Sequence, residues 1–148
     1  MPELFVLLNL LASSYMTGVI WFVQLVHYRQ FDGVGSDQWP AYHARHTTST
    51  GLIVAPLMLV ELLASVGMLV WPARGVPVWV GLTGAALVAL LWASTFFVQI
   101  PLHERLSSSF DPVACRALNT SNWFRTFAWS ARTGLMFYAC WLVMTRVN

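Results

Sequence analysis

The sequence predicts an all-α protein, a membrane-spanning four-helix bundle that forms a single transmembrane domain over residues 1–148. Composition is the first reason, because 57% of the residues are hydrophobic and only 9% are charged, too few charges to cover a soluble surface. The apolar residues also fall into four long runs, each near the roughly 20 residues that a helix needs to cross about 30 Å of hydrocarbon. Tryptophans lie toward the ends of these runs, where an indole can reach the headgroups: Trp21, Trp39, Trp71, Trp79, Trp123 and Trp141.

Each apolar run predicts one helix. The second helix is expected to begin before its run, because Ser36 or Asp37 can cap it and Pro40 suits a first turn. Pro101 is expected to bend the third helix and to free a backbone carbonyl. The four predicted helices cover residues 4–27, 40–71, 76–103 and 121–145.

We expect a multi-pass protein of the inner (cytoplasmic) membrane whose main partner is the lipid bilayer, with a homo-oligomer or a place in a larger membrane complex as further expectations. A net charge of +2 is too small to indicate nucleic acid. The loops between helices one and two and between helices three and four carry more arginine than the opposite side, which favours them as cytoplasmic. The difference is only two residues, so the sequence does not decide which membrane face holds the histidines. The loop side has four arginines and the opposite side has two: Arg29, Arg45, Arg105 and Arg116, compared with Arg74 and Arg146.

Four histidines, His27, His43, His46 and His103, come from three predicted helices and fall at the same end of the bundle. His43 and His46 share a helix face at spacing three, a recurring ligand geometry. Imidazole binds iron, copper and zinc alike, so the residues predict a transition metal without choosing one. Haem held by two axial histidines is the alternative cofactor. A cluster of structural or pH-sensing histidines is the reading without a cofactor.

Each predicted helix also has one polar stripe, which in lipid must face the bundle interior or a wet cavity. Glu61 and Arg132 lie nearest the bilayer centre at similar depth, so they are predicted to pair. The pair is either structural or part of a binding or proton-carrying site.

Two residues near the histidines are candidates for catalysis. Glu104 follows His103 and is either a residue that supports a metal-ligating histidine from the loop or a solvated charge. Arg125 can bind a carboxylate, a phosphate or haem propionates, or it can snorkel to the headgroups. The candidate substrate contacts are Gln24 and Gln99, one turn before His27 and His103, together with Asn122, Trp123, Arg132 and Glu61.

Three stretches resemble known proteins. WFVQLVHYRQF (21–31), YHARHTTSTGLIVAPLMLVELL (42–63) and QIPLHERLSSSFDPVACRALNTSNWFRTFAWSAR (99–132) look like a widespread group of small, uncharacterised bacterial integral membrane proteins. The last stretch also resembles, more loosely, the anthrone-oxygenase-like four-helix membrane proteins. That second resemblance implies oxygen chemistry on an aromatic or quinone-like substrate, although this chain carries additional histidines on helices one and two.

The sequence as a whole therefore favours a metal-dependent membrane oxidoreductase that acts on a lipophilic, aromatic or quinone-like substrate at the histidines. The alternative is a non-enzymatic protein that binds or transfers a metal or haem, or a small subunit of a larger membrane complex. It is supported by the absence of a clear general base or nucleophile other than the histidines.

Overall fold

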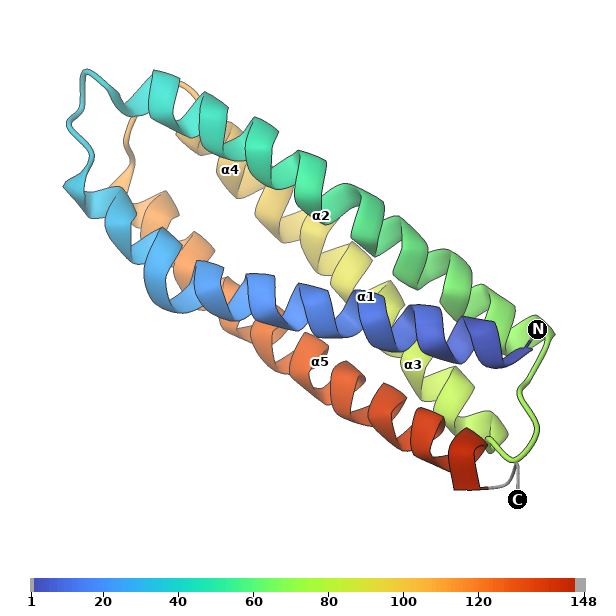
Figure 1. Cartoon of the computed structure of the whole chain (residues 1–148). Coiled ribbons are helices and arrows are strands. Elements are labelled where there is room, and N and C mark those ends of the chain that lie inside the picture. Colours follow the sequence, from blue (N-terminus) through green and yellow to red (C-terminus); the bar gives the residue numbers. More distant parts are fainter. Residues whose placement is uncertain (1, 146–148) are drawn as a thin grey trace.

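The computed structural model describes residues 2–145, which form a bundle of four long helical rods that alternate in direction (Figure 1). Rod one is α1 (Pro2–Phe22) followed by the π-helical η1 (Val23–His27) and the 3₁₀ helix η2 (Tyr28–Gly33). Rod two is α2 (Trp39–Val70). Rod three is α3 (Val78–Ser94), the π-helical η3 (Thr95–Gln99) and α4 (Ile100–Leu106). Rod four is α5 (Pro112–Thr145).

The fold is the predicted membrane bundle. The first three rods, Pro2–Gly33, Trp39–Val70 and Val78–Leu106, are each long and apolar enough to cross a membrane. Rod four, which the sequence also predicts to span the membrane, is not among these three apolar helices; its buried face carries two arginines, Arg125 and Arg132. Large apolar side chains point outward, with Leu52 74% and Phe97 81% exposed, as expected of surfaces that face lipid rather than water.

Rod four begins at Pro112, nine residues before the predicted start at 121. Its first turn is stabilised from the preceding loop, where Asp111 Oδ1 accepts hydrogen bonds from the backbone N–H groups of Val113 (2.8 Å) and Ala114 (3.2 Å). These bonds, with Arg105 on the other carboxylate oxygen at 2.8 Å, hold the pKa of Asp111 below its usual range. The first half of this helix is polar, so the hydropathy pattern did not predict that the helix begins at Pro112.

Rod two begins at Trp39, with Gln38 rather than the predicted Ser36 or Asp37 as its N-cap residue and with Pro40 in the first turn as expected. Together with the 34–38 and 107–111 loops, this start of rod two lies at one end of the bundle (Figure 1). We call it the histidine end, because all four histidines lie in the turns next to it.

Two π-helical turns, η1 and η3, lie toward the histidine end in rods one and three. In η1 the N–H of Tyr28 bonds to the carbonyl of Val23, and in η3 the N–H of Ile100 bonds to that of Thr95, each five residues back. The second turn stands directly before Pro101, where a bend was predicted. A π-helical turn inserts one extra residue and so rotates the following side chains to another face, a feature common at functional sites.

The predicted pair of Glu61 and Arg132 is confirmed deep in the bundle, with Arg132 Nε 3.1 Å from Glu61 Oε1. Trp129 Nε1 donates to the other carboxylate oxygen at 2.9 Å. The guanidinium also donates to three groups, one on each of the other three rods: the backbone oxygen of Gly84 (2.5 Å), the hydroxyl of Ser65 (2.8 Å) and the amide oxygen of Asn9. Both charges are therefore compensated, which is what burial of an ion pair requires.

Candidate functional site: four histidines beside an apolar cavity

The four histidines converge at the histidine end, and we call them the histidine cluster: His27 from η1, His43 and His46 from α2, and His103 from α4. The ring centroids of neighbouring members lie 4.5 Å (His27 and His46), 5.3 Å (His43 and His103), 5.3 Å (His46 and His103) and 6.1 Å (His43 and His46) apart. His43 and His46 share a face because they are three residues apart on one helix. The cluster thus joins three rods, as the sequence predicted.

Within the cluster the rings form two nitrogen-to-nitrogen contacts. His27 Nε2 lies 2.7 Å from His46 Nδ1, and His43 Nε2 lies 3.1 Å from His103 Nδ1. Each contact needs a proton on one nitrogen and a lone pair on the other, so the contacts fix the tautomers together. Among the side chains of residues 2–145, no group of three or more His, Cys, Asp and Glu is arranged as a metal site in this hydrogen-bonded state.

Two hydroxyls complete the cluster, and sequence reasoning missed both. Tyr28 Oη lies 3.4 Å from His103 Nε2, and Thr50 Oγ1 lies 3.2 Å from His46 Nδ1. Thr50 lies one turn after His46, so an i,i+4 search around each histidine would have found it. Tyr28 had no such signal, because its place follows from the change from π-helical to 3₁₀ backbone after His27.

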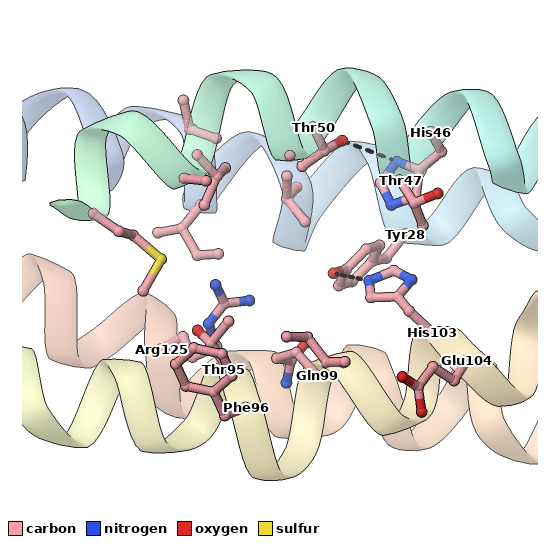
Figure 2. Close-up of a pocket in the computed structure, with 18 of the residues that line it drawn as sticks. Tyr28, His46, Thr47, Thr50, Thr95, Phe96, Gln99, His103, Glu104 and Arg125 are labelled. Carbon is pink, nitrogen blue, oxygen red and sulfur yellow. Dashed lines mark hydrogen bonds between the residues drawn. The ribbon is translucent and has the colours of Figure 1, made fainter.

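A cavity of about 650 Å³ extends from the histidine cluster into the bundle, bounded mainly by rods two and three. His43, His46 and His103 lie on its wall, and most of the remaining wall is apolar. Figure 2 shows His46, His103 and Tyr28 toward one end of the cavity, with the guanidinium of Arg125 projecting into it further along. A second cavity of about 560 Å³ lies between rods one and two and reaches His27.

Exposed residues on the wall mark the mouth of the larger cavity. Gly51 on α2 and Phe96 and Ile100 on rod three are exposed yet belong to its wall. Here α2, which packs along α1 and α3, makes little contact with α4. The mouth therefore opens on the outer surface of the bundle, between rods two and three.

Arg125 is 94% buried, and it differs from Arg132 in its partners. One of its N–H groups donates to Asn122 Oδ1 at 3.2 Å, and its guanidinium carbon lies 5.0 Å from the centre of the Trp129 ring. Within residues 2–145 no carboxylate oxygen lies within 4.0 Å of it, and its Nε has no hydrogen-bond partner. The predicted alternative of snorkelling to the headgroups does not fit this burial.

The other predicted residues divide into three groups. Gln99 and the exposed Glu104 lie on the wall of the larger cavity. Gln24 and Asn122 are buried beside it and bond to each other, Nδ2 of Asn122 donating to Oε1 of Gln24 at 3.0 Å. The third group stands apart from the walls of both cavities: Trp123, whose ring lies edge-on to Trp21, and the buried pair of Glu61 and Arg132.

The four helices carry the predicted polar stripes inward with one exception. Asn9, Ser13 and Gln24 in rod one and Asn122, Arg125 and Arg132 in rod four are all buried. In rod three Gln99 is buried, but Phe96, which lies three residues earlier and so would share its stripe on a regular helix, is 53% exposed, because the π-helical turn between residues 95 and 99 shifts the faces.

Comparison of the chain with models of protein families, with curated proteins and with solved structures finds no match.

Proposed function

We propose that this protein is a metal-dependent membrane oxidoreductase, in which the histidine cluster holds a transition metal and the adjoining cavity takes a lipophilic aromatic or quinone-like substrate. The observation that carries the proposal is the meeting of four imidazoles from three rods at the wall of a largely apolar cavity. Neither feature alone supports this function. Together they bring imidazoles that could bind a redox-active metal next to an apolar cavity of the size of a ligand site.

The nitrogen positions support metal binding. Two nitrogens bound to one ion at about 2.1 Å stand about 3.0 to 3.4 Å apart in octahedral or tetrahedral geometry. The 3.1 Å between His43 Nε2 and His103 Nδ1 lies in that range, so both lone pairs would face one ion if the shared proton moved to the other nitrogen of its own ring and both rings rotated.

The proposed reaction, and not the donor set, narrows the choice of metal. The cluster offers imidazole nitrogen, which binds iron, copper and zinc alike, with the Glu104 carboxylate as the nearest additional ligand type along the chain. Zinc has no redox chemistry of its own, so oxidation by dioxygen at this site would call for copper or iron. The metal would supply one-electron chemistry and an open position for oxygen.

The cavity supports the substrate class. Trp92 and Phe96 stack at 5.4 Å between ring centroids beside the mouth, which suits a flat aromatic molecule arriving from the bilayer. With dioxygen as oxidant, two hydroquinones lose four electrons and four protons in all, and one O₂ takes them up as two waters. Tyr28 and the paired imidazoles provide hydrogen-bonding groups that can receive and pass on the protons released.

The alternative is a protein that binds or transfers a metal or haem without catalysis, or that serves as a small subunit of a membrane complex. The position of the cluster next to the loops at one bundle end favours metal transfer, because an ion there is close to the membrane face. Haem has less support. Neighbouring rings pack 4.5–6.1 Å apart between centroids, so a porphyrin does not fit between them and would have to occupy the cavity with Arg125 beside a propionate.

Metal content tests the first half of the proposal. The wild type, purified in mild detergent, is expected to retain a stoichiometric amount of copper or iron, and His43→Ala and His103→Ala are expected to lose most of it. Arg45→Gln is the matched control, since Arg45 is exposed and directly precedes His46. Equal metal in all four proteins would remove the two histidines from the site.

Oxygen uptake tests the second half. With a short-chain alkyl hydroquinone, the metal-loaded wild type is expected to consume one O₂ for every two hydroquinones, and the chelated protein is expected to consume none. Retained metal without oxygen uptake would favour the non-enzymatic alternative, and a Soret band in the purified protein would favour haem.

A further inference from the structure

Three buried polar atoms within residues 2–145 have no hydrogen-bond partner: Trp92 Nε1, Gln99 Oε1 and Arg125 Nε. All three belong to residues on the wall of the larger cavity. Buried polar groups in folded proteins are almost always satisfied, so unsatisfied ones gathered at one cavity indicate a missing partner. Two of the three are N–H donors, and one of these donors carries a positive charge.

The two buried arginines of rod four show what Arg125 lacks. Arg132 donates to a carboxylate, two side-chain oxygens and a backbone carbonyl. Arg125, seven residues earlier on the same buried face, has one amide oxygen as its hydrogen-bond partner. Stripping a guanidinium of water is costly unless an anion faces it. The cavity is the space in which that anion can lie, because the guanidinium projects into it (Figure 2).

The other residues of the cavity wall indicate the chemistry of the rest of the ligand. Met16, Ile20, Val54 and Met58 give the part of the cavity formed by rods one and two an apolar lining. A volume of about 650 Å³ is in the range of sites for single drug-sized ligands. Glu104, the carboxylate on the wall among the described residues, lies at the end with His103 and away from Arg125, so it does not compete for the guanidinium (Figure 2).

We infer that the larger cavity binds an amphiphile with an anionic oxygen head, in which the head bonds to Arg125 and Trp92 and the apolar body lies against the methionines and branched side chains. A carboxylate is the head that best fits, because its two oxygens match the planar fork of a guanidinium. That this amphiphile is the substrate of the histidine cluster rests on the function proposed above. Binding of the amphiphile in the cavity requires no metal.

The test compares two ligands of equal chain length on metal-free protein. Wild type is treated with chelator in detergent and incubated with oleate or with oleyl alcohol, and bound ligand is counted by native mass spectrometry. Oleate is expected to bind about tenfold or more tightly than the alcohol, because hydrogen bonds to charged groups are worth more than neutral ones. Arg125→Gln should remove this difference and Arg125→Lys should keep part of it. Arg74→Gln, which alters an exposed arginine at the other end of the bundle, should leave it unchanged.

A second pair of ligands identifies which anionic group the cavity binds. Phosphatidic acid and dioleoylglycerol are compared in the same way, so that a lipid phosphate is distinguished from a free carboxylate, and preference for either anion over its neutral analogue supports the inference. A photoreactive fatty acid should label residues on the cavity wall such as Met58 and Phe96, and excess oleate should prevent the labelling. Equal binding of oleate and oleyl alcohol to wild type would overturn the inference even if Arg125→Gln fails to fold.

Metal content measured on untreated samples separates this result from the proposed function. Preference for the anion in a protein that never carries metal would overturn the metal function and leave the binding site. Bound metal without any preference for an anionic head would overturn the binding site and leave the metal function.

Discussion

Nε2 of His27 lies 2.7 Å from Nδ1 of His46, and the two rings are tilted by 33° with their centroids 4.5 Å apart. This contact joins the π-helical turn η1 of rod one to the second turn of rod two. His46 Nδ1 also lies 3.2 Å from the Thr50 hydroxyl. Thr50 therefore helps decide which nitrogen of His46 carries the proton, and hence which lone pair is free for a metal.

Thr50→Val is expected to lower metal affinity about 10- to 100-fold, the usual cost of removing a hydrogen bond that orients a ligand. The change keeps the shape of the side chain and removes only the hydroxyl. Competition with a chromophoric chelator measures the affinity. Thr47→Val is the matched control on the same helix, since the Thr47 hydroxyl bonds to backbone carbonyls of its own helix. Similar affinities for the two variants would show that the Thr50 hydroxyl does not orient the ligand.

Glu61→Gln is expected to destabilise the bundle by about 3–5 kcal/mol, because it leaves the buried Arg132 guanidinium without its counter-charge. The free energy of unfolding in mixed micelles of mild detergent and dodecyl sulfate measures the loss. Replacing both partners, with Glu61→Gln and Arg132→Met together, should cost less than Arg132→Met alone, because no buried charge is left unpaired. Metal content should be retained in every folded variant, since neither residue lies on a cavity wall. If the double variant lost as much unfolding free energy as the two single variants together, the two side chains would not stabilise each other as a pair.

Much of this architecture follows from residue spacing alone. The apolar runs predict the rods, and the inward polar stripes of rods one and four follow from helical periodicity at residues such as Asn9 and Arg132. The convergence of the four histidines follows from the alternation of direction, which returns every second loop to one end. The rods, the stripes and the meeting of the histidines thus follow from the local sequence pattern and from the order of the helices along the chain.

The details of the site depend on packing, which spacing does not encode. A π-helical turn costs local hydrogen bonding and persists because neighbouring rods stabilise it, so neither η1 nor η3 was predictable. The different partners of Arg125 and Arg132 were unpredictable for the same reason. Both lie on one stripe seven residues apart, and only the positions of rods one to three decide that one arginine meets Glu61 while the other meets a cavity.

Acid is expected to loosen the first turn of α5 through Asp111. Because backbone hydrogen bonds hold the pKa of Asp111 below its ordinary value of 3.8, the carboxylate stabilises the fold fully above that value. This contribution is lost as the pH falls through the lower pKa of the folded state. Protection of the Val113 and Ala114 amides from hydrogen exchange, corrected for the intrinsic rate, should therefore decline below about pH 3.8. In Asp111→Asn the protection should be lower at neutral pH and should lack this decline, and a decline that persists in the variant would assign it to another group.

Gly67→Ala is expected to destabilise the bundle by about 1–3 kcal/mol, the usual cost of forcing extra volume into a packed contact. A Cβ at residue 67 would overlap the ring of Phe5, which itself stacks on Trp71 at 5.7 Å between centroids, so the ring has a packed neighbour to displace before it can yield. Gly18→Ala is the matched control, because a Cβ there meets nothing within 4 Å and alanine is the better helix former. Unfolding of both variants in the same mixed micelles should rank them on opposite sides of wild type. The double variant Gly67→Ala with Phe5→Leu should recover part of the loss, because leucine removes the atoms that the new methyl group would meet. Equal stability of Gly67→Ala and Gly18→Ala would mean that α1 and α2 separate enough to admit a methyl group, and that the close approach of these two helices is not required for the fold.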